Sequence, residues 1–522
     1  MSVQLSIGSD IADFEEPLRR LVSDRVASRI FGRDASLWGR AAEPEAAIRL
    51  GWTDFMRTAE QLIPRIEALR AEFLAQGVDR FVLCGMGGSS LAPAVITRWA
   101  GVELTMIDST HPDAVRRVLD AQELPRTAVV VSSKSGSTIE TRSHLAAFSH
   151  AFRAVGIDPA ERIVIVTDPG SPLDGESRAA NRRVFNADPH VGGRFSALTA
   201  FGLVPSGLAG ADLHALVSDA QNVREALASD SPENPAARLA AAIAAGLPER
   251  FVLAVSEAAG SEWGFGAWIE QLVAESTGKD GRGVLPIALP ATAAEIAAPP
   301  ANTVRVRAGA VLPDPDHTGS EAGWDLATAG ALGSQILLWE VATAALGRLM
   351  GIDPFNQPDV EAAKVAARAA LGTAAARGSD APEAPDADRL AAELRAIAPA
   401  GGYLAIQAYV DPAGRYAAAL RELRQRLATE LGVPVALGFG PSYLHSVGQL
   451  HKGGPALGAF LQVTEVVDRD LMIPGAESSF GALIAAQVRG DREVLEERGR
   501  PVLVLPLSGS GDPSLGELLA AL

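Results

Sequence analysis

The sequence predicts an α/β protein in which parallel sheets carry helices on both faces. Short apolar runs rich in valine, isoleucine and leucine recur along the chain, with helix-length segments between them. The runs fall into three groups, and 522 residues are enough for two or more units with substantial cores. Strands that alternate with helices form βαβ units, and such units build parallel sheets that are buried on both faces.

Helical periodicity marks the N-terminal part of the chain, and the first group of strands follows it. Residues 1–78 predict helices, with amphipathic stretches around 12–31 and 53–76. At residue 80 the pattern changes to short runs of the buried-strand type, the first of which is followed by glycines. The strands predicted in this group are 80–85, 102–108, 127–133 and 162–168.

Two further groups repeat this pattern. The second contains predicted strands at 250–256, 284–289 and 303–309 and leads into a long apolar helix near 328–350. Residues 373–388, rich in Ala, Pro and Asp, predict a flexible linker. After the linker, the third group has strands near 403–410, 433–440 and 501–507.

The charge balance argues against nucleic acid and anionic membranes as partners. The net charge is −17 at pH 7, so an anionic small molecule must be met by a local positive site. No apolar run reaches the length of a membrane span, and the N-terminus lacks the pattern of a signal peptide. The single Cys84 fits a reducing compartment. We therefore expect a cytoplasmic protein with no membrane partner and no nucleic-acid partner. We also expect no cofactor, and no metal site, because no group of His, Cys and carboxylate residues has the spacing of metal ligands.

Lysine is rare in this chain and is placed selectively. Of the 46 basic residues only four are lysines, namely Lys134, Lys279, Lys364 and Lys452. All four lie in segments rich in glycine, hydroxyl or amide groups. Lysine is a compact point charge that can donate or lose a proton, whereas arginine stays charged. Chance could place one lysine in such a segment, but the coincidence of four favours an anion-handling site.

Two loops at the ends of predicted strands have the character of a phosphate site. GMGGSS (85–90) follows one strand and opens a helix, and its glycines let backbone N–H groups approach an anion. It lacks the ending of a Walker loop and the third glycine of a dinucleotide fingerprint. SSKSGST (132–138) follows another strand and offers hydroxyls, N–H groups and one lysine. A hydroxyl-rich helix cap explains part of this pattern, but not the lysine together with so many hydroxyls.

With these loops the chain resembles the phosphoglucose isomerase family, whose fold is the sugar isomerase fold. Three further segments carry the resemblance in family order: GGRFSALTAFGLVP, QLVAESTGK and FNQPDVEAAK. They span roughly residues 80–365. The remainder, with GFGPSYLHSVGQLHKGGP, is similar to the isomerase half of bifunctional transaldolase/glucose-6-phosphate isomerase fusions. With 79 residues ahead of the first strand, we expect a stand-alone relative of that half.

The resemblance implies two sugar-isomerase-type α/β sandwich subdomains, with a helical N-terminal segment and an extra C-terminal α/β region. The predicted division is 1–79 for the helical segment, 80–205 for the first sugar isomerase (phosphate-binding) domain, 206–372 for the second, 373–388 for the linker and 389–522 for the C-terminal region. It also makes a homodimer an expected assembly. The C-terminal region leaves open that one chain completes its own site.

The activity that the resemblance implies is the interconversion of glucose 6-phosphate and fructose 6-phosphate through a cis-enediolate, in glycolysis and gluconeogenesis. In the family's pattern Glu275 matches the base, Arg194 the group that stabilises the enediolate, and Lys364 a donor to the ring oxygen. The residues that match its substrate contacts are Gly88, Ser89, Ser133, Lys134, Ser135, Thr138 and Gln357. Without the motifs, Glu275 could equally be an ordinary glutamate at a helix end, and Arg194 an ordinary surface arginine.

One part of the family pattern is missing. Where the family often carries a ring-opening histidine, an ungapped count back from FNQP reaches Ala331. His445 and His451 lie downstream, six residues apart in a Gly/Ser/Gln segment beside Lys452. Our hypothesis is that His451, or failing that His445, replaces the missing group.

Several functions remain open at this point. A non-catalytic sugar-phosphate-binding regulatory module would need the two loops but not the matched Arg194, Glu275, Gln357 and Lys364. An isomerase for an aminosugar phosphate, or one that also acts on mannose 6-phosphate, would use the same proton-transfer residues. An interaction subunit for a separate transaldolase is the third alternative.

Overall fold

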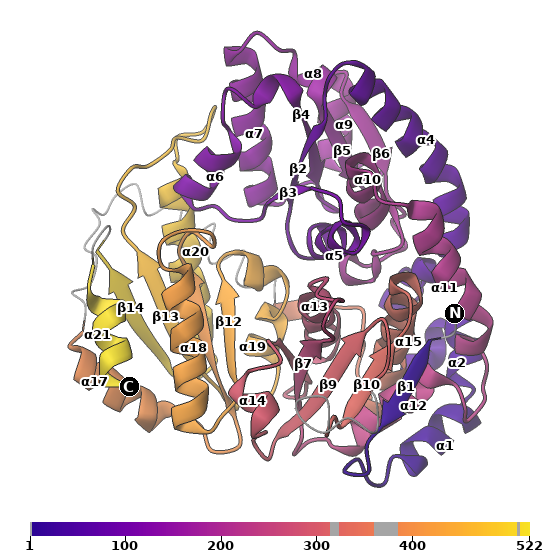
Figure 1. The fold of residues 1–522 in the computed structure, drawn as a ribbon. Coiled ribbons are helices and arrows are strands. Elements are labelled where there is room, and N and C mark those ends of the chain that lie inside the picture. The colour runs from indigo at the N-terminus through magenta and orange to yellow at the C-terminus, as the bar shows by residue number, and fades with distance from the viewer. Residues whose placement is uncertain (1–2, 314–322, 360–384, 509–511) are drawn as a thin grey trace.

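The computed structural model confirms the predicted fold class. It describes residues 3–313, 323–359, 385–508 and 512–522, which form three mainly parallel sheets flanked by helices. In Figure 1 the first unit lies at the top, the second at the lower right and the third at the lower left. The predicted linker, 373–388, lies mostly outside the described residues.

The first sheet is fully parallel and is buried on both faces. Its order is β3 (Thr105–Ile107), β2 (Arg80–Gly85), β4 (Thr127–Ser132), β5 (Ile163–Thr167) and β6 (Arg183–Asn186). One face packs on α4 (Phe55–Ala75), α5 (Leu91–Ala100) and α10 (Ala200–Ala209). The other packs on α6 (Pro112–Val118), α7 (Ile139–Ala154) and the start of α9 (Pro172–Ala179), with α8 (Pro159–Arg162) leading into β5.

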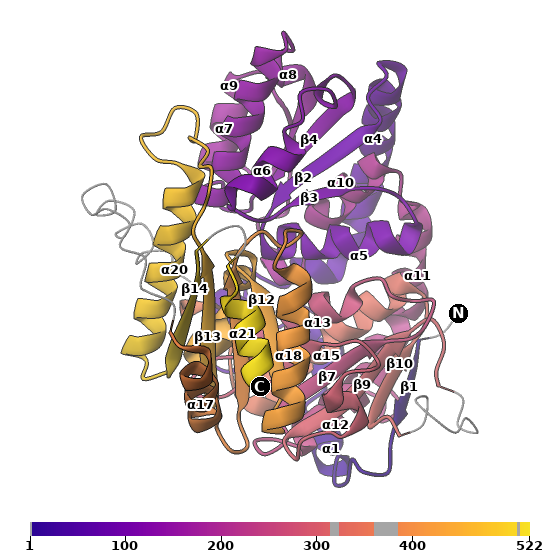
Figure 2. The ribbon, with the colours of Figure 1, turned by 60° about the vertical axis from the view of Figure 1, so that its left-hand side comes forward.

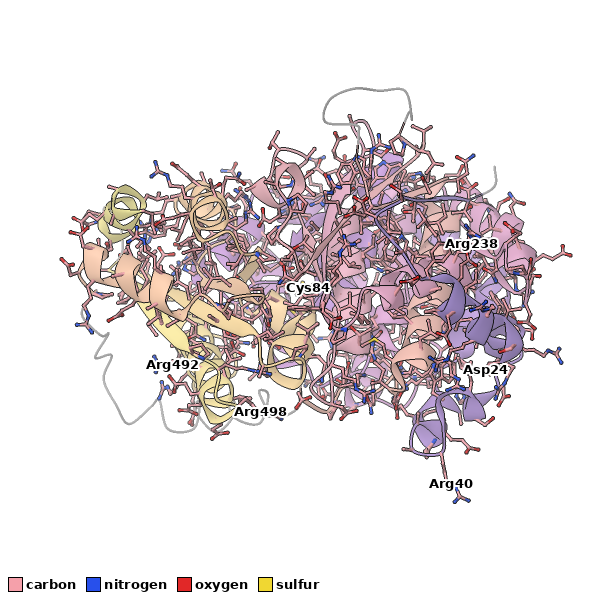
Figure 3. All side chains as sticks on the ribbon, turned by 90° about the horizontal axis from the view of Figure 1, so that it is seen from below. Asp24, Arg40, Cys84, Arg238, Arg492 and Arg498 are labelled. Atoms are coloured by element: carbon pink, nitrogen blue, oxygen red, sulfur yellow. The ribbon has the colours of Figure 1, made fainter. Side chains whose placement is uncertain are left out.

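Residues that alternate along β2 divide between these two faces, as a buried parallel strand requires. Phe81 and Leu83 belong to one core, and Val82 and Cys84 to the other. Figure 3 shows Cys84 in the middle of the molecule, and burial raises the pKa of its thiol far above the usual range. The only cysteine is therefore a small core residue.

The second sheet has the order β1 (Gln4–Ile7), β10 (Leu326–Ala329), β9 (Thr303–Gly309), β7 (Val252–Glu257) and β8 (Leu285–Ala288). All pairs are parallel except β1 with β10. The helices of this part are α1 (Glu15–Ser23), α2 (Val26–Phe31), α3 (Glu43–Ala46), α11 (Leu213–Leu227), α12 (Pro235–Ala245), α13 (Phe265–Thr277), α14 (Ala294–Ala297) and α15 (Leu332–Met350).

Two local predictions are corrected here. The N-terminus begins with a strand, because QLSI completes the open edge of β10, whereas the sequence predicted only helices. The run that predicted one helix from about 328 begins as strand β10 and becomes helical only at Leu332.

The third sheet has the order β12 (Val435–Phe439), β11 (Tyr403–Tyr409), β13 (Gly458–Glu465) and β14 (Val502–Leu507), all parallel. Its helices are α17 (Ala387–Ile397), α18 (Ala417–Leu431), α19 (Gly448–Gly453), α20 (Phe480–Glu497) and α21 (Ser514–Ala521). Figure 2 shows α18 and α21 in front of this sheet.

The third unit is packed against both of the others. Tyr403 and Tyr409 share a core with residues of β7 and β8. Arg424 on α18 forms a buried ion pair with Glu295 on α14, at 2.8 Å. Ile473 and Phe480 pack into the core on one face of the first sheet. A loop that follows a strand of the third unit can therefore reach a site formed by the other two.

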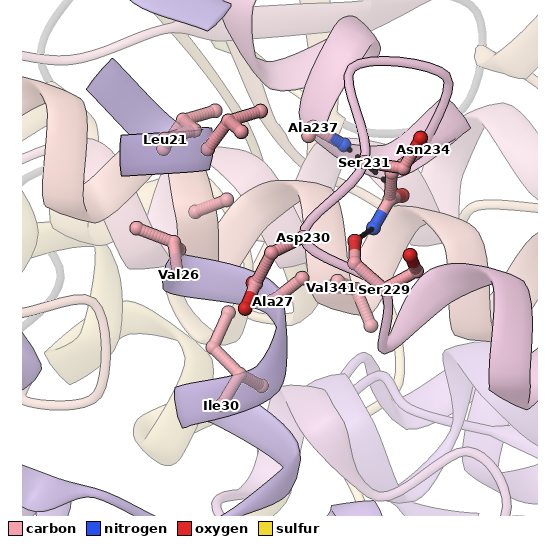
Figure 4. Close-up of a pocket in the computed structure, with 12 residues that line it drawn as sticks. Leu21, Val26, Ala27, Ile30, Ser229, Asp230, Ser231, Asn234, Ala237 and Val341 are labelled. Carbon is pink, nitrogen blue, oxygen red and sulfur yellow. Dashed lines mark hydrogen bonds between the residues drawn. The ribbon is translucent and has the colours of Figure 1, made fainter. Parts of the chain in front are cut away.

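The N-terminal helices dock on the second unit across a small hollow. Leu21, Val26 and Ile30 face Asp230 and Asn234 around a void of about 10 Å³, which is about the room that one water molecule needs. Figure 4 shows the Asn234 side chain between the loop before α12 and the helix itself: it donates to the Ser229 carbonyl and accepts from the Ala237 backbone N–H. The hollow is an imperfection of helix packing and has no cluster of titratable groups.

Close helix packing at one glycine gives the first prediction. A Cβ atom on Gly333, in α15, would collide with the Leu216 carbonyl oxygen of α11, whereas one on Gly175, in α9, meets open space. We expect Gly333→Ala to destabilise the protein by about 1–3 kcal/mol through overpacking, and Gly175→Ala to stabilise it by up to about 1 kcal/mol. Urea unfolding of both variants tests this, and equal effects would contradict the packing.

Candidate functional site

The two loops singled out in the sequence lie side by side, because β2 and β4 are paired in register. The first forms a short 3₁₀ helix, Gly87–Ser89. In the second, Ser133 donates to the Thr138 hydroxyl at 3.1 Å, and Ser135 lies 3.0 Å from the Ser137 hydroxyl. Thr138 precedes α7 without capping it through its side chain. Hydroxyls and the first N–H groups of a long helix therefore converge, which favours an anion.

Lys134 was expected to contact the phosphate, but its ammonium is paired with a carboxylate of the protein. Its ammonium donates to Asp168 at 2.6 Å and to the Pro189 carbonyl at 3.4 Å. Burial raises the pKa of Asp168, and the charge of Lys134 partly opposes that rise. The positive charge of Lys134 is thus already paired, so hydroxyl and backbone donors make up most of this anion site.

Backbone contact joins the first loop to Arg194 and to the third unit. A Cβ atom on Gly88 would collide with the Gly193 carbonyl oxygen, and one on Gly87 with the His445 carbonyl oxygen. Gly87 also has a φ of 55°, which favours glycine. The turn can therefore pack directly against the segments that carry Arg194 and His445.

Arg194 is buried and almost fully bonded. Its Nε donates to the Ser276 hydroxyl at 2.8 Å, Nη1 donates to Gln357 Oε1 at 3.3 Å, and Nη2 donates to the carbonyls of Pro354 and Asn356 at 2.6 and 3.1 Å. Nη1 also lies 3.6 Å from Glu275 Oε1. Burial lowers the pKa of this guanidinium and Glu275 opposes the fall, so Arg194 remains a fixed positive charge.

Glu275 lies in the last turn of α13 and is only 6% exposed. Gln271, one turn earlier, donates to Glu275 Oε2 at 3.2 Å and to the His445 carbonyl at 2.8 Å. Sequence reasoning assigned no role to Gln271, although its spacing of four from Glu275 places both on one face of the helix. It also assigned none to Ser276, whose contact with Arg194 depends on the tertiary structure. The carboxylate is held between Arg194 and an amide in a site with little water.

The segment 353–357 is held by two buried cations. Besides Arg194, Lys279 donates to the carbonyls of Asp353 and Asn356, each at 2.7 Å, and to the Asn356 side chain at 2.8 Å. Burial, and then the charge of Arg194, lower the pKa of Lys279 to about 7. Lys279 therefore positions the turn that brings Gln357 to Arg194. Lys364 lies outside the described residues.

His445 is the histidine that reaches the site. It ends the 3₁₀ helix Ser442–His445, and its Nε2 lies 3.1 Å from Glu140 Oε1 in the first turn of α7. Gln487 donates to the same Glu140 oxygen at 2.7 Å. Nothing in the sequence indicated Glu140, because its partners are more than 300 residues away.

His451 belongs to a core instead. It lies 2.9 Å from the Tyr403 hydroxyl through Nδ1 and packs against the rings of Tyr403 and Phe460. Burial, with nearby Lys452 and Arg500, lowers its pKa to about 3. The preference for His451 over His445 thus has no support in the geometry. Ala331 precedes the first turn of α15 and has no acid–base group.

The described residues contain neither a candidate membrane span nor a cluster suited to a metal ion. None of the helices there is long and apolar enough to cross a membrane. No group of three or more His, Cys, Asp or Glu side chains in that part of the chain is arranged to hold a metal ion.

Comparison with known proteins finds relatives of this chain in one family. The model of the family described as Phosphoglucose isomerase matches residues 59–284. A protein of Haloarcula marismortui named "Probable glucose-6-phosphate isomerase" is 32% identical over 362 residues, which cover 59% of this chain and 82% of that protein.

Two further relatives extend the comparison. The glucose-6-phosphate isomerase of Synechococcus sp. (strain JA-3-3Ab) is 34% identical over 282 residues, covering 50% of this chain and 52% of that protein. The crystal structure of a glucose-6-phosphate isomerase from Chlamydia trachomatis superposes with a TM-score of 0.55 at 20% identity, covering 72% of this chain and 89% of that one. At this identity the superposition shows a common fold.

Burial of His451 predicts a pH dependence of stability. Its pKa is about 3 in the folded protein and about 6.5 when unfolded, so the unfolded state binds more protons between these values and stability falls as the pH falls through this window. We expect His451→Gln to reduce the slope of unfolding free energy against pH by up to about 1.4 kcal/mol per pH unit. Urea unfolding at pH 5 and pH 7 measures it. His150 is exposed, so His150→Gln serves as a control that should leave the slope unchanged. An unchanged slope in His451→Gln would contradict the burial of His451.

Proposed function

Because the chain belongs to the phosphoglucose isomerase family, we propose that it interconverts glucose 6-phosphate and fructose 6-phosphate. The observation that carries the proposal is the convergence of Arg194, Glu275 and Gln357 beside an anion-binding pair of loops. A binding module needs the loops, but it has no use for a buried carboxylate held 3.6 Å from a buried guanidinium.

The phosphate of the substrate would lie against the second loop. Ser133, Ser135 and Thr138 offer hydroxyls, and the start of α7 offers N–H groups that its cap leaves without a side-chain partner. The Gly88–Ser89 turn borders the same space. Because Lys134 is paired with Asp168, we assign it to shaping the loop rather than to neutralising the phosphate.

Glu275 would transfer the proton between the two sugar carbons. Its carboxylate removes the proton from C2, the C2–H electron pair forms the C1–C2 double bond, and the carbonyl pair of C1 moves onto O1 to give the enediolate. The hydroxyl proton of O2 then passes to the adjacent O1, the C2–O2 carbonyl forms, and the carboxyl of Glu275 delivers a proton to C1, which can exchange with solvent while Glu275 holds it. The negative charge that develops on the sugar oxygen is stabilised by Arg194, whose bonds fix it in place before the reaction. Gln357 is held by Arg194 at the same place.

His445 would open the sugar ring. As the C1–O5 bond breaks, the proton of the O1 hydroxyl passes to the imidazole and O5 receives a proton, for which the family resemblance implies Lys364. Support for His445 comes from its place beside the first loop and from Glu140, whose carboxylate lies within hydrogen-bond distance of Nε2 and orients the ring. The third unit would thereby supply the group that is missing at Ala331.

The base is tested by Glu275→Gln in a coupled assay of fructose 6-phosphate conversion with a chelator present. We expect kcat to fall by about two to four orders of magnitude, because one general base is lost. Glu270→Gln, the same change five residues earlier on α13, serves as control and should stay near the wild-type rate. A wild type that binds the sugar phosphate without converting it would favour the regulatory module, and turnover of mannose 6-phosphate would widen the substrate range.

Ring opening is tested separately from proton transfer. We expect His445→Gln to slow the exchange between the α and β anomers of glucose 6-phosphate by about 100-fold or more, measured by exchange NMR. Glu275→Gln should keep that exchange and lose deuterium incorporation from solvent. If His451→Gln rather than His445→Gln abolished anomer exchange, the assignment of His445 would be wrong.

A further inference from the structure

A second cationic cleft lies along α7, away from the two loops. It has a volume of about 410 Å³ and lies between α7, α9 and the loop that contains Pro474 and Gly475. In Figures 1 and 2 the trace that leads into α20 rises alongside α7. Arg142 and Arg153 of α7 line the cleft, as does Arg182, which follows α9. None of residues 133–138 lines it.

Positive charge in this cleft exceeds its local compensation. Arg142 is paired with Glu176 at 2.7 Å, whereas Arg153 and Arg182 form no ion pair with any residue that the structure describes. Burial, followed by repulsion from Arg153, lowers the pKa of Arg182, while the charges of Glu176 and Asp158 partly oppose that fall. Unpaired guanidiniums that face one another are unfavourable unless an anion joins them, and this chain has a net charge of −17.

Buried polar atoms at the cleft lack partners as well. Arg182 Nε is buried without a hydrogen bond within the described parts of the chain. Ser149, which lines the cleft and is 6% exposed, has a hydroxyl in the same condition. Buried donors without partners are uncommon in native proteins and indicate that something else satisfies them.

We propose that this cleft binds a small phosphorylated metabolite, held by Arg153 and Arg182 together with Arg142. Guanidiniums are suited to phosphate because they present parallel N–H donors. The volume matches a metabolite of ordinary size and is within the range of small-molecule sites.

Arg142 connects the cleft to the loop of the catalytic phosphate. Its Nη1 donates to the Gly136 carbonyl at 3.3 Å, and its Nη2 bonds Glu176. An anion in the cleft competes with Glu176 for Arg142 and so changes the support of the loop 132–138. The occupied cleft therefore regulates substrate binding, a consequence that rests on the proposed isomerase function, whereas binding itself does not.

Binding is tested by arginine footprinting with inorganic pyrophosphate as the probe. Wild-type protein is treated with phenylglyoxal, and modification of each arginine is followed by peptide mass spectrometry. We expect pyrophosphate to protect Arg153 and Arg182 from modification. Arg40, which is exposed and projects away from the molecule in Figure 3, should stay unprotected. Absence of protection at Arg153 and Arg182, or equal protection at Arg40, would overturn the site.

Variants then test the site and its coupling. Arg182→Gln should raise the pyrophosphate concentration that half-protects Arg153 by at least about tenfold, since it removes charge-assisted hydrogen bonds. Arg40→Gln makes the same change in net charge and should have no effect. Arg153→Gln, an exposed position, with protection read at Arg182, gives a second test should Arg182→Gln fold poorly.

The regulatory step has its own readout. Pyrophosphate should change the KM for fructose 6-phosphate more in the wild type and in Arg40→Gln than in Arg182→Gln. Protection without this difference in KM would overturn the regulation and leave the site standing. An enzyme without turnover but with protection would contradict the proposed function alone.

Discussion

The arrangement of this molecule depends on a point where three backbone segments meet without room for a side chain. Gly87 and Gly88 follow β2 of the first unit and touch the carbonyls of His445 from the third unit and of Gly193 beside Arg194. A Cβ atom at either position would separate those segments. The place of the guanidinium, and of the histidine that the third unit brings, therefore follows from two glycines in the turn after β2 of the first unit.

Buried charge organises the second half of the site. A guanidinium or ammonium taken out of water needs oxygen partners, and Arg194 and Lys279 obtain theirs mainly from carbonyls of segment 353–357. The same bonds bring Gln357 to Arg194 and leave Glu275 facing a cation that cannot move away. Segments far apart in the chain are thus held together, because a buried cation without oxygen partners would be strongly unfavourable.

Helix α7 joins the two anion sites. Its first turn contributes N–H groups and Glu140 to the candidate site, and its flank carries the arginines of the second cleft. The third unit contacts both places, through His445 at one and the loop at Pro474 at the other. Ile473 and Phe480, which pack on the first sheet, hold the third unit against this part of the molecule. The similarity to the bifunctional fusions stays a prediction, as do the domain boundaries.

The sequence alone determined the fold class and the segments that form the site. Strands such as β2 and β4 were predictable because buried parallel strands are short, apolar and bounded by glycine or hydroxyl residues. β1 was not, since QLSI becomes a strand only by pairing with β10. Arg194, Glu275 and Gln357 came from the resemblance to the family's motifs, and the structure brings them together, while their roles stay predictions. Tertiary structure alone decided that Lys134 is paired with Asp168, that His445 rather than His451 reaches the site, and that three arginines line one cleft. Each of these outcomes depends on which groups, distant in the sequence, are buried next to one another. A local sequence pattern does not contain that information.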